Sequence, residues 1–257
     1  MRRRINSWGL FALALLAVPP PLTAQIEPGS LVGKQELVST LPADSEYPEP
    51  RELVRAETGR LSTMTARFHE GGKHGGIVEH REVFLAMHAR PGFTGTAYDR
   101  GIAAVREDSL FRVVYVAEID PGLGFVTRLE TLVPPGSPFD ARLLHVRYAQ
   151  TGSGGVTEDL LFALDADGQL VEVPIVQPDL QQLLEEGEYL CCGRFTEFDD
   201  DMIEFTVYVT RSGRHGITHS VRSRFSLQGG FEFDAGRQQY VPRFRLVTLE
   251  TSDREPR

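Results

Sequence analysis

The chain has 257 residues, of which 41% are hydrophobic and 25% are charged, and its formal net charge at neutral pH is −9. These values are typical of a folding globular chain, and they exclude collagen-like, wholly disordered and disulfide-scaffold proteins. We expect no nucleic-acid partner, because contacts with phosphates need positively charged patches that an acidic chain lacks.

The first 24 residues have the pattern of a secretory signal peptide. Arg2, Arg3 and Arg4 precede an apolar run at residues 8–18, and a Pro-rich stretch ends at Ala24. The run of about 11 residues is well short of the roughly 20 that a helix needs to cross a bilayer. We therefore expect export to the periplasm or the extracellular space, cleavage near Ala24, and no membrane span.

Residues 25–57 are rich in proline and poor in aromatic side chains. This composition is typical of a linker or a loosely docked arm. A short helix is expected at residues 51–58, because Gly59 follows it in the position that a helix end prefers.

From residue 58 to residue 250 the dominant hydrophobic period is two, as in β-strands. The clearest predicted strands are residues 110–119, 125–133, 143–150, 156–164, 170–176, 203–211, 217–227 and 243–249. Turn sequences such as Asp165-Ala166-Asp167-Gly168 separate them. One helix is expected at residues 179–186, with Asp179 as its N-cap, and residues 251–257 are expected to be a C-terminal tail.

A meander of such strands has two exposed edges, and closure into an up-and-down barrel removes both. We therefore predict an all-β, mainly antiparallel fold: a barrel of about 8–10 strands over residues 58–250, with one or two short helices. A barrel of this size can hold one small ligand. The polar row Arg222, Arg224 and Ser226 along one strand is either a solvated exterior or the wall of a polar cavity.

No motif predicts a metal or a cofactor. Four of the seven histidines fall between His69 and His88, but their spacing with nearby glutamates matches no compact ligand pattern. The chain also has no nucleophile elbow, no His-Glu-x-x-His and no phosphate-binding loop, so a catalytic site would have to be assembled from distant residues.

The two cysteines, Cys191 and Cys192, are adjacent and cannot join distant parts of the same chain. Two reduced small side chains, an oxidised vicinal pair and an intermolecular link all remain open.

Five short segments carry a family resemblance. They are Met64-Thr65-Ala66-Arg67-Phe68, Phe111-Arg112-Val113-Val114-Tyr115, Leu132-Val133-Pro134-Pro135 with Phe139, Thr218-His219-Ser220, and Phe233-Asp234-Ala235-Gly236-Arg237. Their order resembles the CpcT/CpeT-type chromophore (bilin) lyase family, which attaches bilins to cysteines of phycobiliproteins. The family's Tyr-Arg-Gln-Arg stretch is reduced here to Phe111-Arg112, and its Trp-Asp-Arg-Gly turn has become Phe-Asp-Ala-Gly.

The resemblance implies a calycin-like barrel with a cavity for an extended apolar acid such as a tetrapyrrole, and lyase activity is implied by the resemblance alone. The ligand-binding candidates are Arg112, Arg222, Arg224, Asp234 and Arg237. Asp234 lies in the matching turn, and the four arginines are the candidates to pair with ligand carboxylates, because guanidinium meets carboxylate bidentately.

Three hypotheses follow. The first is an exported β-barrel that binds a small amphipathic carboxylate ligand, and the second is a non-catalytic structural or protein-binding β-domain with a packed interior. An exported enzyme with a spatially assembled site is the third.

Overall fold

The computed structural model describes most of the chain, in segments separated by short gaps. These segments are residues 26–68, 74–92, 97–120, 124–134, 140–149, 157–173, 179–199, 202–212, 217–226, 231–236, 239–242 and 244–253. The expected signal peptide, at residues 1–24, lies outside the described residues.

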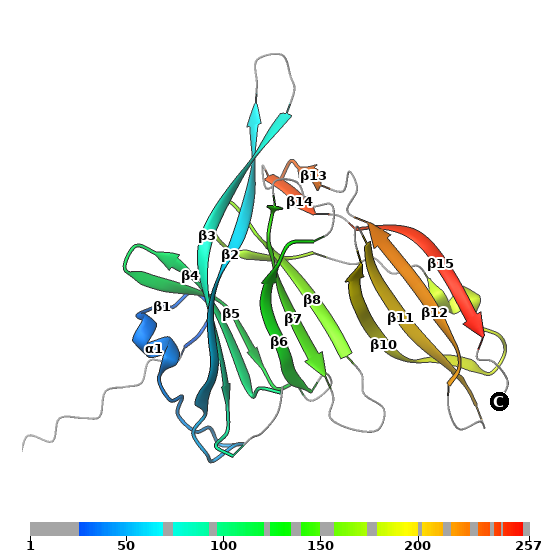
Figure 1. The fold of residues 1–257 in the computed structure, drawn as a ribbon, viewed down its shortest axis with the longest axis horizontal. Coiled ribbons are helices and arrows are strands. Elements are labelled where there is room, and N and C mark those ends of the chain that lie inside the picture. Colours follow the sequence, from blue (N-terminus) through cyan, green and yellow to red (C-terminus); the bar gives the residue numbers. More distant parts are fainter. Residues whose placement is uncertain are drawn as a thin grey trace, which may run out of the picture.

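The described strands form two β-sheets (Figure 1). The strands of the first sheet are β1 (Leu31–Val32), β2 (Glu52–Phe68), β3 (His74–Ala89), β4 (Arg100–Glu107), β5 (Leu110–Glu118), β6 (Phe125–Leu132), β7 (Leu143–Ala149), β8 (Thr157–Leu164), β9 (Leu170–Glu172), β13 (Phe231–Asp234) and β14 (Gln239–Pro242). Those of the second sheet are β10 (Glu188–Asp199), β11 (Met202–Arg211), β12 (Ile217–Ser226) and β15 (Arg245–Asp253).

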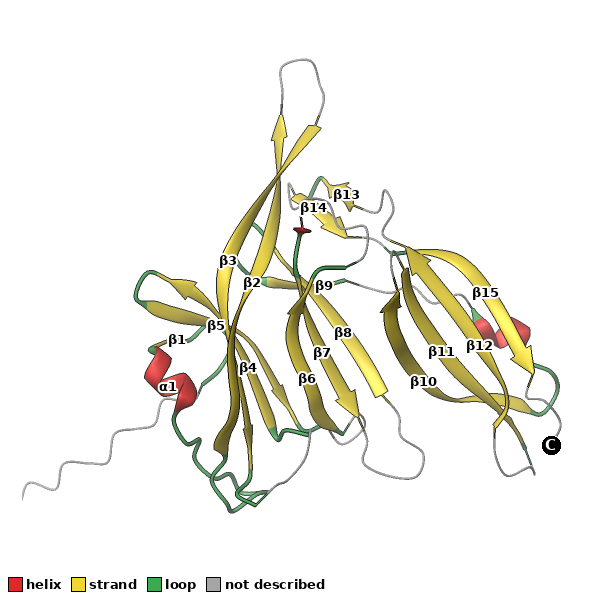
Figure 2. Ribbon diagram, in the orientation of Figure 1, coloured by secondary structure: helices red, strands yellow, loops and turns green. Residues whose placement is uncertain are grey.

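The main path of the first sheet runs β1-β5-β4-β3-β2-β8-β7-β6, and the second sheet runs β10-β11-β12-β15. Two short helices, α1 (Lys34–Val38) and the 3-10 helix η2 (Leu180–Leu183), lie outside the sheets (Figure 2). Neither described helix has the length and apolar character that crossing a membrane requires.

The prediction of a mainly antiparallel β-protein is confirmed. Among the described strands every pairing is antiparallel except a single parallel contact of Thr63 on β2 with Leu164 on β8. All eight predicted strands overlap an observed one, and the predicted turn before β9 is present, since Gly168 has φ +78° and its N–H donates to the carbonyl of Asp165. Period-two patterning therefore located the strands well.

The first sheet rolls up, but the described residues do not form a closed barrel. Its last strand, β6, folds back across the sheet and forms an isolated bridge with the segment before β4, in which Tyr98 and Val126 exchange two backbone hydrogen bonds of 2.7 and 3.2 Å. Strands β5 and β1 continue beyond this point on the other side of β4. The prediction of a single barrel over residues 58–250 is also wrong in a second respect, because the strands of this region form two separate sheets.

Two glycines let β6 approach the sheet closely. A Cβ atom added to Gly59 on β2 would lie 2.6 Å from Thr131 Oγ1 on β6, and one added to Gly101 on β4 would lie 3.1 Å from Leu129 Cδ2 on the same strand. Since any larger residue would push the strands apart, the rolled sheet is narrow at both positions.

Aliphatic and aromatic side chains fill the inside of this roll. The buried cluster there consists of Leu61, Val83, Leu85, Met87, Tyr98, Ala103, Val105, Ala117, Val126, Leu129, Leu144, Val146, Tyr148 and Leu164. Contributions come from seven strands and from the segment before β4, so one continuous core holds the first sheet together.

The second sheet packs against the first through the opposite face of β7 and β8. Leu143 and Leu161 share a buried cluster with Ile203 on β11 and Phe225 on β12. Farther along the second sheet, Leu180 of η2 packs against the same apolar face. Asp179 caps η2 as predicted, but the helix is shorter than residues 179–186 because Leu184 already has extended backbone.

The N-terminal arm differs from expectation. Instead of docking loosely, it packs Val32, Leu37 and Leu41 against the outer face of the first sheet. The helix expected at residues 51–58 is wrong, since Glu52 begins β2, which pairs with β3 along its length. Hydrogen bonding to a long partner strand outweighs the weak local signal of Gly59, which serves a close strand approach and not a helix end.

We predict that Gly59→Ala destabilises the protein by about 1–3 kcal/mol, because the new methyl group overlaps Thr131. Urea unfolding measures this change. The double variant Gly59→Ala/Thr131→Ala removes the two closest atoms and should recover most of the loss. Equal stability of the wild type and Gly59→Ala would contradict the close contact of β2 with β6.

Candidate functional site

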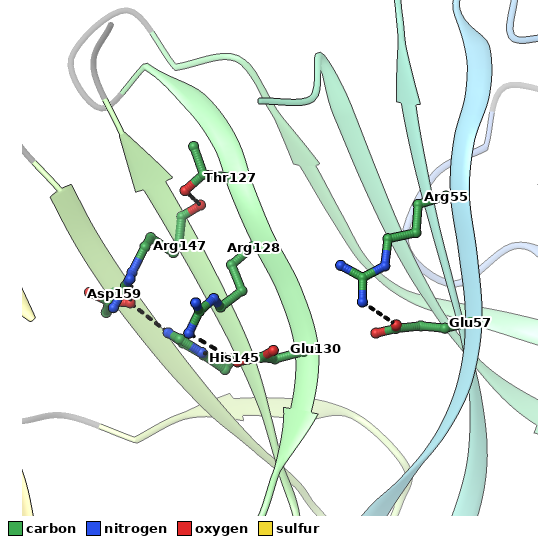
Figure 3. A network of polar contacts seen from close by, with 8 residues as sticks. All are labelled: Arg55, Glu57, Thr127, Arg128, Glu130, His145, Arg147 and Asp159. Carbon is green, nitrogen blue, oxygen red and sulfur yellow. Dashed lines mark hydrogen bonds and ion pairs between the residues drawn. The ribbon is translucent and has the colours of Figure 1, made fainter. Parts of the chain in front are cut away.

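A buried histidine on β7 lies between two carboxylates from the neighbouring strands (Figure 3). His145 Nδ1 is 3.1 Å from Glu130 Oε1 on β6, and His145 Nε2 is 2.5 Å from Asp159 Oδ1 on β8. Arg147 Nε donates to the same Asp159 oxygen over 2.7 Å, and Arg128 lies 3.5 Å from Glu130. We call these five residues the His145 cluster.

Strand register brings the cluster together. Glu130 is directly opposite His145 in the β6–β7 ladder, and Arg147 is directly opposite Asp159 in the β7–β8 ladder. Side chains alternate along a strand, so His145 shares a face with Leu143, while Leu144 and Val146 point into the core of the roll. The cluster therefore lies on the face whose apolar residues contact the second sheet.

Burial and charge act in opposite directions on this histidine. The side chains of His145 and Asp159 are 0% and 1% exposed. Burial by itself would lower the pKa of His145, but the hydrogen bonds with Asp159 and Glu130 outweigh it and raise this pKa above its ordinary value. The hydrogen bond from His145 in turn lowers the pKa of Glu130. The arrangement favours an imidazolium held between two carboxylates.

This geometry suits cohesion better than catalysis. Both ring nitrogens of His145 already face carboxylate oxygens, so neither is free to take a proton from a substrate. The ion pairs instead join the neighbouring strands β6, β7 and β8.

Figure 3 also shows a separate ion pair on β2, in which Arg55 and Glu57 lie 2.8 Å apart.

Among the ligand-binding candidates, Arg112 lies on β5 and pairs with Glu107 of the adjoining strand β4. Its guanidinium also lies near the turn before β9: a Cβ atom added to Gly168 would be 3.0 Å from Arg81 Nη1 and 3.7 Å from Arg112 Nη2. Two guanidinium groups thus flank a turn of the same chain, and Arg112 already has a carboxylate partner.

The candidates Arg222 and Arg224 lie on β12 in the second sheet. They share one carboxylate on β11: Arg222 Nε is 3.0 Å from Glu204 Oε1, and Arg224 Nε is 2.9 Å from Glu204 Oε2. Their side chains are 43% and 32% exposed, so this row lies on a partly solvated sheet face. We call these three residues the Glu204 clamp.

Of the two remaining candidates, Asp234 and Arg237, the structure describes the first. Asp234 Oδ1 accepts a hydrogen bond of 2.9 Å from the N–H of Gly236 and so closes the turn after β13. Arg237 lies outside the described residues. The described candidates are therefore divided between the two sheets and a turn, with Arg112 on the first sheet and Arg222 and Arg224 on the second.

One serine–histidine pair is present on neighbouring strands. Ser62 Oγ on β2 is 2.8 Å from His80 Nδ1 on β3 and also accepts a hydrogen bond from the N–H of Arg142. Within the described segments no carboxylate bonds to His80, and the nearby Glu82 pairs with Arg106. The pair therefore lacks the acid that would orient its histidine for nucleophilic catalysis.

Metal binding would need histidines, cysteines or carboxylates that lie close together. In the described part of the chain, no three His, Cys, Asp or Glu side chains are grouped so as to hold a metal ion. Cys191 falls at a register shift of β10, and Cys192 pairs with Tyr208 in the β10–β11 ladder. The cysteine side chains lie outside the described residues, so the three open interpretations of this pair stand.

Sequence analysis missed the His145 cluster. A signal was available in the sequence. Two predicted strands carry charged or titratable residues, at positions 145, 147 and 159, on a face where Leu143 and Leu161 are apolar. What the sequence did not provide was the register between the strands, which decides that Glu130 and Asp159 meet the same ring.

We predict that His145→Gln lowers the free energy of unfolding by roughly 3 kcal/mol at about pH 6, because it removes one partner from a buried ionic cluster. A histidine with a raised pKa contributes stability below its unfolded pKa and loses it as the pH rises through the folded value. The gap between wild type and variant should therefore shrink towards about pH 9, where Glu130 stays ionised.

Urea unfolding at the two pH values measures this gap, and His80→Gln, at an exposed position, is the matched control. A gap that is the same at both pH values would contradict an imidazolium at position 145.

Comparisons with known proteins found no relative of this chain. No protein-family model matches the chain, and no curated protein and no solved structure matches it.

Proposed function

We propose that this chain is an exported, non-catalytic β-domain that acts through contacts with protein and not by holding a small molecule. The observation that carries the proposal is the filled interior of the rolled sheet. Leu61, Leu85, Leu129 and Leu144 are at most 1% exposed there, and Gly59 keeps β2 in contact with β6. A cofactor-sized ligand needs a concave pocket of several hundred cubic ångströms, and a packed core offers no such space.

The charged groups support the same proposal. A ligand carboxylate approaching Arg222 or Arg224 would have to displace Glu204, and one approaching Arg112 would have to displace Glu107. A covalently attached carboxylate is hard to displace, because it is always present at high effective concentration. Arg112, Arg222 and Arg224 therefore stabilise the fold by pairing with carboxylates on neighbouring strands.

Surface composition supports a protein-binding role. The edge strand β15 of the second sheet exposes apolar side chains: Leu246 is 41%, Val247 is 54% and Leu249 is 37% exposed. Tyr189, which is 49% exposed, lies on β10 at the opposite edge of this sheet. Exposed apolar residues that lie close together mark contact surfaces more often than isolated ones do.

Binding of a small amphipathic carboxylate, such as a tetrapyrrole in a calycin-like barrel, is the second candidate. It is favoured by the rolling of β6 across the first sheet and by the two guanidinium groups of Arg81 and Arg112 beside Gly168. Export rests on the leader-like sequence at residues 1–24 and belongs to both candidates.

Titration of the purified protein with biliverdin and with haem, followed by absorbance, separates the two candidates. We expect the spectra of both pigments to stay those of the free molecules. The variant Glu204→Gln makes the test stricter, because it weakens the competitor for Arg222 and Arg224, and the spectra should still stay unchanged. A saturable shift at one pigment per chain would overturn the proposal and support the second candidate.

A further inference from the structure

A histidine is buried between the N-terminal arm and the first sheet. His88 on β3 is 0% exposed, and in the part of the chain that the structure describes neither of its ring nitrogens has a hydrogen-bond partner. Phe84 and Ala86 on the same strand belong to the apolar cluster that the arm covers. Because side chains alternate along a strand, His88 lies on this covered face. A ring that is buried without a partner disfavours a charge, so the closed fold holds His88 neutral.

Residues 33–50 of the arm, which we call the arm cover, lie over this histidine. The backbone of Leu37 and of Ser39 lies beside its ring. At the end of the arm cover, the backbone groups of Leu41 and Arg51 form an isolated bridge, with hydrogen bonds of 2.8 and 3.0 Å. Strand β3, by contrast, is paired with β2 along its length and with β4 over its second half. The arm cover is therefore the element that can move away from the ring without breaking the sheet.

The charged groups nearest to His88 would repel a protonated ring. Arg100 on β4 is directly opposite His88 in the β3–β4 ladder, and Arg51 lies where β2 begins. The carboxylates beside these two arginines are already paired with them: Asp44 Oδ2 is 2.6 Å from Arg51 Nη2, and Glu118 Oε1 is 3.0 Å from Arg100 Nη2. An imidazolium in the closed state would therefore add a positive charge beside two balanced ion pairs.

Other charged groups of the surrounding elements are also engaged. Asp99 accepts hydrogen bonds from the N–H and from Nε of Arg90, which balances its charge. On the arm cover, Glu36 accepts a hydrogen bond from the N–H of Gly33, and Lys34 Nζ lies 5.0 Å from the centre of an aromatic ring on β3. The arm cover thus brings one more positive charge to this face of the sheet.

These surroundings shift the titration of the buried ring. Burial, together with the positive charges of Arg100 and Arg51, lowers the pKa of His88 to about 4, although the backbone of Leu37 and Ser39 acts in the opposite direction. In water the ring would regain the ordinary pKa of about 6.5. Between these two values the open state binds more protons than the closed state, so the closed state loses stability as the pH falls through this range.

We propose that the arm cover is a pH-sensitive device, which stays closed while His88 is neutral and opens when acid protonates this ring. Opening gives the imidazolium water as a partner, and it uncovers the apolar outer face of the first sheet, which includes Phe84 and Ile102. The Arg51–Asp44 pair does not supply the switch, because the hydrogen bond from Arg51 holds the pKa of Asp44 below its ordinary value. This inference goes beyond the proposed function and does not depend on it.

Hydrogen–deuterium exchange of the purified full chain, with rates corrected for the intrinsic pH dependence of amide exchange, tests the opening. The reporters are the amides of Leu41 and Arg51, which bond to each other's carbonyls at the end of the arm cover. With a pKa of about 4 in the closed state and about 6.5 in the open state, their protection should fall roughly twentyfold from about pH 7 to about pH 5. The amides of β7 should keep their protection.

The variant His88→Gln cannot take up the proton, so its Leu41 and Arg51 amides should be equally protected at both pH values. His80→Gln is the matched control, because His80 is exposed on the same strand, and it should keep the wild-type response. A wild-type arm cover that is equally protected at both pH values would overturn the proposal. So would a response that persists in His88→Gln, or a loss of protection that β7 shares.

A nuclear magnetic resonance titration of the wild-type histidine rings covers the case in which His88→Gln fails to fold. We expect the midpoint of His88 to lie well below the ordinary value, and the methyl resonances of Leu37 and Leu41 to change at this same midpoint. A His88 ring that titrates at the ordinary pKa would contradict the opening. Methyl resonances that do not follow the titration of His88 would contradict it as well.

Discussion

The close contact of β6 with β2 and β4 determines most of what this molecule can do. Gly59 and Gly101 remove the side chains that would separate these strands, so Thr131 and Leu129 reach the opposite wall of the rolled sheet. The space between is then filled by one continuous apolar cluster. Close packing of this kind stabilises the sheet through buried apolar area, and the same packing removes the volume that a small ligand would need.

The charged residues also pair with one another within the fold. Glu130 and Asp159 surround His145, and Glu204 bridges Arg222 and Arg224. In each group, opposite charges on neighbouring strands pair with one another, which helps to hold the strands in one register. The charged groups of both clusters are therefore engaged within the fold, and the exposed apolar side chains of β15 are its clearest contact surface.

Local patterns in the sequence were enough to place strands and turns, as β5, β6 and β7 and the turn at Gly168 illustrate. They did not reveal the partner of each strand. Residues 52–58 follow a proline-rich stretch and precede a glycine, yet they form a strand because β3 pairs with them. The His145 cluster and the Glu204 clamp depend on register in the same way, since one residue of slip would move each partner to the other face.

The central claim is that β2 and β6 are in contact through the interior of the first sheet. Nuclear Overhauser spectroscopy tests this directly, by asking whether the α-protons of Gly59 and the methyl protons of Thr131 share a cross-peak. The structure predicts a strong cross-peak, because a methyl-sized group at Gly59 would overlap Thr131. Its absence in the assigned spectrum would mean that the strands stand apart around a hollow, and it would contradict a packed interior.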